Sequence, residues 1–151
     1  FDSGGLLGAL QANTASGIFG TLRSVDWAGG QAVEVAQANQ VHTGKATILS
    51  NISGDQVEEY EIEIVKIFPD SQQDGRDYLI TVTDQRLLAT TGGIVQGMSG
   101  SPILQDGRFV GAVTHVLIND PACGYGISAR RMLTAADGAA DGQTVGKVGN
   151  R

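Results

Sequence analysis

Residues 97–115 read GMSGSPILQDGRFVGAVTH, a glycine-rich loop followed by two apolar runs. The runs, 103–104 and 109–116, flank Asp106-Gly107, and Asp-Gly between apolar segments is a strong signal for a β-hairpin. The loop before them holds Ser99 among glycines, which adopt backbone conformations that other residues avoid. This stretch therefore predicts a β-hairpin that is entered through a tight loop with a serine at its centre.

The rest of the chain shows a period of two more often than the 3.6 of a helix. Tyr60, Ile62 and Ile64 alternate with glutamates, which predicts a strand with one buried face and one acidic face. That strand forms a predicted hairpin with 45–52, and further strands are expected at 33–35 and 78–83. The pattern is typical of an all-β domain.

Two short helices interrupt this pattern. Residues 84–91 have helical composition, with Asp84 as a suitable N-cap and two glycines following, and residues 128–136 have it as well. We expect one domain, or one large part of a two-part domain, over residues 1–138 and a flexible tail over 139–151, where small and polar residues dominate.

The composition narrows the classes of function. The 151 residues are 41% hydrophobic and 17% charged, so a packed core is expected. The formal net charge of −6 argues against a nucleic-acid-binding domain, which would carry a basic stripe. Cys123 is the only cysteine, so an internal disulfide is excluded, and a buried or incidental thiol is favoured over a nucleophile. No apolar run approaches the roughly 18 residues of a membrane span.

Ser99 has the surroundings that a nucleophilic serine needs. Glycines allow a tight backbone and an exposed hydroxyl, and the N–H groups of Gly97 and Ser99 could hold a developing oxyanion. The loop followed by a hairpin resembles the nucleophile segment of chymotrypsin-like serine proteases. A plain turn that joins two strands explains the loop alone equally well.

A closer resemblance rests on five blocks in a fixed order. They are residues 16–22, 61–65, 80–88, 91–103 and 111–126. In this order and spacing they resemble the peptidase domain of the stage IV sporulation protein B (SpoIVB-type) serine peptidase family, over roughly residues 12–136. The resemblance implies a chymotrypsin-like β-barrel domain of which this chain is the incomplete, C-terminal part.

The resemblance assigns roles to two residues. Ser99 matches the nucleophile of the family, and Asp84 matches its catalytic aspartate. A carboxylate at the end of a strand could orient an imidazole, although the residue pattern alone favours a plain N-cap, and the two roles are compatible. Gln85 stands where the family usually has proline, which reduces rigidity at the turn.

The general base is the missing part of the site. The catalytic histidine of the family lies in a Gly-His segment ahead of the region that corresponds to Phe1, and the base is expected on such a preceding segment. His42 lies in a polar turn and is interpreted as a surface residue. Thr114 and His115 are expected to line the substrate groove. No metal or other cofactor is expected.

By resemblance, the parent protein is a serine endopeptidase that cleaves itself and a protein regulator of an intramembrane protease. It would carry an N-terminal anchor and a PDZ domain, and would act outside the cytoplasm, between the forespore membranes. Its expected partners are a protein or peptide substrate, its own N-terminal segment, and a second copy bound through exposed strand edges. The alternative is a catalytically silent protein-binding fragment, or a degenerate relative that lacks the base.

Overall fold

The computed structural model describes residues 8–22, 32–52, 54–69 and 75–138. Within the chain, contacts define two units, and the larger unit, Val33–Arg130, holds the predicted site. In the other unit, β1 (Gly8–Thr14) and β2 (Gly17–Leu22) pair as an antiparallel hairpin. Residues 129–138 form a helix. None of the helices in the described ranges is long and apolar enough to cross a membrane.

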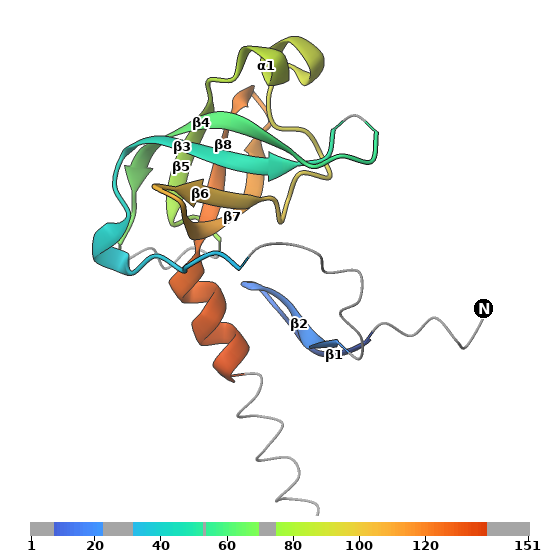
Figure 1. The fold of residues 1–151 in the computed structure, drawn as a ribbon, viewed down its shortest axis with the longest axis vertical. Helices are drawn as coiled ribbons and strands as arrows, with labels where there is room; N and C mark the ends of the chain where they lie inside the picture. The colour runs from blue at the N-terminus through green and yellow to red at the C-terminus, as the bar shows by residue number, and fades with distance from the viewer. Residues whose placement is uncertain (1–7, 23–31, 53, 70–74, 139–151) are drawn as a thin grey trace, which may run out of the picture. The chain divides into compact units, whose positions relative to one another are not determined.

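The larger unit is a closed six-stranded barrel with the order β3-β4-β5-β8-β7-β6 (Figure 1). Its strands are β3 (Gly44–Ser50), β4 (Glu58–Ile67), β5 (Tyr78–Val82), β6 (Pro102–Gln105), β7 (Arg108–Leu117) and β8 (Asp120–Ser128). The helix α1 (Gln85–Thr91) lies between β5 and β6 in sequence, and a 3-10 turn, η2 (Ala38–Gln40), precedes β3. In Figure 1, α1 lies at one end of the barrel and the yellow segment after it leads back to β6.

The apolar side chains of the alternating strands point inward and fill the barrel. Tyr60, Ile62 and Ile64 of β4 are buried, while the residues between them are exposed, as the sequence predicts. The largest fully buried side chains come from all six strands and from α1: Ile48, Ile62, Ile64, Ile80, Leu87, Ile103, Ile127, Val110 and Val113. β-Branched side chains dominate this set because they pack well on a pleated surface.

The structure confirms most of the predicted elements. The β3–β4 hairpin and the β6–β7 hairpin are both present, and Asp106 and Gly107 turn the latter with φ of 52° and 73°. Asp84 is the N-cap of α1, and Gly92 ends that helix in the left-handed conformation. The all-β prediction is confirmed.

Some expectations about strands differ from the structure. The segment 33–35 is not a strand, because only Val35 forms an isolated bridge, with Phe109. The barrel is closed by a short pairing of β3 with β6, at Thr47↔Leu104 and Ile48↔Ile103, while pairing with a second copy through strand edges stays a prediction. The strands β1, β2 and β8 have no counterpart among the predicted elements. The predicted tail at 139–151 lies outside the described residues.

Candidate active site

Ser99 lies in the loop that connects α1 to β6, and this loop is anchored on both sides of the serine. Met98 is buried, whereas Ser99 itself is exposed. The N–H of Gly100 donates to the carbonyl of Val113 at 2.7 Å, and the N–H of Val113 donates to the carbonyl of Ser101 at 2.9 Å. The loop is therefore fixed to β7 while it presents the serine to solvent.

The loop also leaves backbone donors available. Within the described part of the chain, the N–H groups of Gly97 and Ser99 have no hydrogen-bond partner. Gly97 and Gly100 flank the serine with φ of 102° and 92°, conformations that L-residues rarely adopt. Two unpaired N–H groups beside an exposed hydroxyl are what the predicted oxyanion site requires.

The structure brings Ser99 together with Thr114 of the predicted groove. The hydroxyl of Ser99 donates to the carbonyl oxygen of Thr114 at 3.1 Å. Thr114 is the extra residue of a β-bulge in β7, and its own hydroxyl contacts the carbonyl groups of Gly75 and Tyr125. His115 is exposed and its Nδ1 lies 3.0 Å from the Thr114 hydroxyl, so its ring is beside the groove residue and has no hydrogen bond to Ser99.

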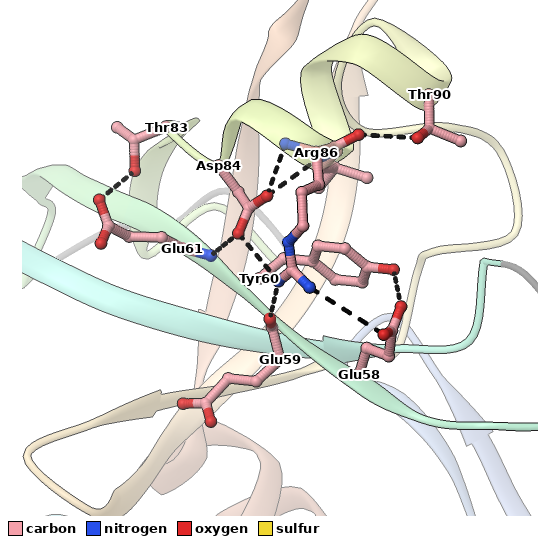
Figure 2. A network of polar contacts seen from close by, with 9 residues as sticks. Glu58, Glu59, Tyr60, Glu61, Thr83, Asp84, Arg86 and Thr90 are labelled. Atoms are coloured by element: carbon pink, nitrogen blue, oxygen red, sulfur yellow. Dashed lines mark hydrogen bonds and ion pairs between the residues drawn. The ribbon is translucent and has the colours of Figure 1, made fainter.

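Asp84 is held in a dense set of hydrogen bonds at the start of α1 (Figure 2). Its Oδ1 accepts from the N–H groups of Arg86 (2.9 Å) and Leu87 (3.2 Å), and its Oδ2 accepts from the N–H of Glu61 (3.1 Å). Burial alone would raise the pKa of Asp84, but these hydrogen bonds and the Arg86 side chain outweigh it, so the pKa is lowered. The carboxylate is therefore ionised, and it joins α1 to β4.

Arg86 is a member of this network that the sequence did not single out. Its Nη2 lies 3.3 Å from Oδ2 of Asp84 and donates to the carbonyl of Glu59 at 2.9 Å. Its guanidinium also lies over the Tyr60 ring, 5.1 Å from the centroid. In the sequence, Arg86 is visible only as an arginine two residues after a helix-capping aspartate. This spacing does not indicate which strand the arginine side chain contacts.

His42 is placed at the opposite end of β6 from the serine. Its Nε2 lies 2.8 Å from Oδ2 of Asp106, in the β6–β7 turn, and its Nδ1 lies 2.9 Å from the carbonyl of Thr43. Ser99 precedes β6 and Asp106 follows it, so the length of this strand separates the His42 ring from the serine. The interpretation of His42 as a surface residue agrees with this placement.

We predict that the His42–Asp106 pair makes stability depend on pH. The bond to Thr43, and then the bond to Asp106, raise the pKa of His42 above its ordinary value. A raised pKa in the folded protein means that the pair stabilises below the ordinary pKa and that this contribution is lost as pH rises through the raised pKa. In denaturant titrations, wild type should exceed His42→Ala in stability more at about pH 5.5 than at about pH 8.5.

The matched control for this prediction is Asp106→Asn, because asparagine tolerates the left-handed backbone of position 106. Removing the carboxylate should shrink the pH dependence of the His42→Ala difference. If the pH dependence of the stability difference were unchanged in the Asp106→Asn background, a group other than Asp106 would be responsible for it.

The remaining candidates add no chemistry. The Sγ of Cys123 lies near Thr81 and Asp120, and burial, as the largest effect, raises the pKa of this thiol. In the portion of the chain that the structure describes, no group of three or more His, Cys, Asp or Glu side chains could hold a metal ion.

Comparisons with known proteins give one matching family and three similar solved structures. The family model described as SpoIVB peptidase S55 matches residues 1–133. No curated protein matches the chain. Three solved structures are similar to it, all of the Rv3671c protease from M. tuberculosis and all at 20% identity.

The active form of that protease has a TM-score of 0.59, with 81% of this chain and 53% of that chain covered. The inactive form has 0.57, with 84% and 64% covered, and a serine-to-alanine mutant in the inactive form has 0.56, with 95% and 65% covered. The chain thus spans between about half and two thirds of the length of these structures. The likeness shows a shared chymotrypsin-like protease fold.

Proposed function

Because the chain belongs to the SpoIVB peptidase S55 family, we propose that it carries the nucleophile of a serine endopeptidase, Ser99. The observation that supports this proposal is an exposed serine on an anchored glycine loop, with the unpaired N–H groups of Gly97 and Ser99 beside it in the described part of the chain. An acyl-transfer enzyme needs this combination, because the nucleophile and the oxyanion donors must act on one carbonyl group.

In the proposed mechanism, the Oγ of Ser99 attacks the scissile carbonyl carbon and forms a tetrahedral intermediate. The carbonyl oxygen becomes an oxyanion that accepts hydrogen bonds from Gly97 and Ser99. The proton of Ser99 passes to an imidazole and then to the leaving amine as the peptide bond breaks. Water then releases the acyl group from Ser99.

Thr114 and His115 are the proposed groove residues. The carbonyl of Thr114 accepts a hydrogen bond from the Ser99 hydroxyl in the structure. Thr114 is therefore next to the nucleophile, where a bound substrate would also lie. Attack requires that Ser99 break this bond and donate to a base instead. The exposed ring of His115 is then available to contact substrate side chains.

The base of the proposed mechanism comes from a histidine on a preceding segment of the parent protein. Support comes from the two histidines of this chain: His42 contacts Asp106 and Thr43, and His115 contacts Thr114. The preceding segment is thus the first proposed partner. The proposed substrates are the protein itself and a protein regulator of an intramembrane protease, cleaved outside the cytoplasm.

A second candidate function is a protein-binding module without catalysis. The observation that favours it is that neither described imidazole is hydrogen-bonded to the Ser99 hydroxyl, which instead donates to Thr114. A serine without a base is a poor nucleophile.

Labelling with a fluorophosphonate probe tests the proposed function. The full-length parent protein should be labelled at Ser99, located by peptide mass spectrometry. This 151-residue chain should be labelled far more slowly, because neither His42 nor His115 is hydrogen-bonded to Ser99. Equal and negligible labelling of both proteins would favour the binding module.

A further inference from the structure

We propose that Ile94 restricts the substrate residue whose carbonyl group Ser99 attacks, so that this residue has a small, uncharged side chain. This inference rests on the proposed function of Ser99 and names the class of substrate that the same site takes. Ile94 lies between Gly92, which ends α1, and the loop that carries Ser99.

The first step is the place of the scissile carbonyl group. Its oxygen must approach the N–H groups of Gly97 and Ser99, while its carbon must approach the Oγ of Ser99. This Oγ lies 3.1 Å from the carbonyl oxygen of Thr114 on β7. The substrate residue that supplies the carbonyl group therefore lies between the Gly97 side of the loop and Thr114, and its side chain needs room beside these two segments.

The second step is the position of the Ile94 side chain. The N–H of Ile94 donates to the carbonyl of Pro121 at 2.7 Å, which ties this residue to β8. Its Cδ1 lies 2.7 Å from the position that a Cβ on Gly124 would take, and the carbonyl oxygen of His115 lies 2.5 Å from the same position. Ile94 therefore reaches from the start of the serine loop to the place where β8 meets the backbone of the residue after Thr114.

The third step is the packing around Ile94. Ile94 and Met98 are each only 3% exposed, and Val113 is 1% exposed. The Sδ of Met98 accepts the N–H of Val95 at 3.4 Å, so the Met98 side chain lies against the segment that carries Ile94. Buried side chains pack as closely as molecules in organic crystals, so a bulky substrate side chain would have to displace Ile94. The aliphatic Ile94 also offers no partner to a charged side chain, and an unpaired charge is costly to bury.

The test uses diphenyl phosphonate probes that carry the side chain of alanine, leucine or phenylalanine next to phosphorus, with the full-length protein. The Oγ of Ser99 forms a bond to phosphorus, one phosphorus–phenoxy bond breaks, and phenol leaves with the serine proton. Intact mass spectrometry follows the rate of adduct formation. Wild type should react with the alanine probe at least about a hundredfold faster than with the phenylalanine probe, because a single methylene group is already worth about 10–200-fold in an apolar site.

Ile94→Ala removes the atoms that meet Gly124, so the reaction with the phenylalanine probe should become about tenfold faster or more, with little change for the alanine probe. Ile103→Ala is the matched control. Ile103 is also fully buried, and its Cδ1 lies 2.8 Å from the position of a Cβ on Gly126 in the same strand. Loss of core packing alone should leave the ratio of the two rates unchanged. If Ile94→Ala does not fold, Ile94→Val replaces it, and the leucine probe should then gain on the alanine probe.

Three results would overturn the inference. The first is a wild-type protein that reacts with the phenylalanine probe as fast as with the alanine probe. The second is a folded Ile94 variant that keeps the wild-type ratio of rates, and the third is the same change of ratio in Ile103→Ala. Failure of the proposed function looks different: no probe would then modify Ser99, any labelling would persist in Ser99→Ala, and the role of Ile94 would be rejected with it.

Discussion

Replacing Ser99 with alanine should reduce peptidase activity of the full-length protein by about 10⁶-fold, as loss of a serine nucleophile does elsewhere. The physical reason is that alanine leaves no oxygen at this position to attack the scissile carbonyl. Stability should change little, because the Ser99 side chain is exposed and makes a single hydrogen bond, to Thr114. Activity is followed as appearance of cleavage products on a time course, and folding by thermal unfolding.

Ser101→Ala is the matched control for this experiment. Ser101 lies in the same loop, and its backbone is hydrogen-bonded to Met98 and Val113. Loss of its side-chain hydroxyl should leave cleavage within a fewfold of wild type. If Ser99→Ala retained wild-type cleavage, or if both alanine variants lost activity alike, Ser99 would not be the nucleophile.

Local sequence patterns predict much of the barrel, because several of its elements depend on neighbouring residues. The alternation at Tyr60, Ile62 and Ile64 and the Asp106-Gly107 turn each specify a strand or hairpin without distant information. Such patterns do not predict the strand β8. Its sequence, DPACGYGIS, has small residues and glycine at positions where apolar residues would show an alternation. This segment is a strand because it pairs with β5 on one side and with β7 on the other, and its own composition does not indicate these pairings.

The candidate site divides in the same way. Ser99, Gly97 and the cap at Asp84 each lie in a short stretch of chain with its own pattern, so local residues can indicate them. The contact between Ser99 and Thr114 depends instead on a β-bulge in β7, and that of Arg86 with Glu59 depends on the packing of α1 against β4. Both contacts join segments that are far apart in the sequence, so a pattern within either segment does not predict them.

The largest expected effect on stability comes from Gly93→Ala. A Cβ at this position would lie 2.2 Å from the carbonyl oxygen of Pro121, and the residue has φ of 138°. The neighbouring N–H of Ile94 is hydrogen-bonded to that same carbonyl, so the two backbones cannot separate without losing the bond. Overpacking costs about 1–3 kcal/mol and a strained backbone conformation a similar amount, so we expect a loss of about 3 kcal/mol or more in unfolding free energy.

Gly92→Ala separates the two causes, because Gly92 has φ of 75° and a Cβ added there would meet no atom within 4 Å. It should lose only the contribution of the left-handed conformation, about 1 kcal/mol. Chemical denaturation of both variants measures the difference. Because Gly93 sets the point where the serine loop leaves α1 and contacts β8, Gly93→Ala should also slow fluorophosphonate labelling of Ser99 in the full-length protein while it is still folded. Equal losses of stability in the two variants would mean that the Pro121 contact can relax, and that the path of the loop to Ser99 is not fixed there.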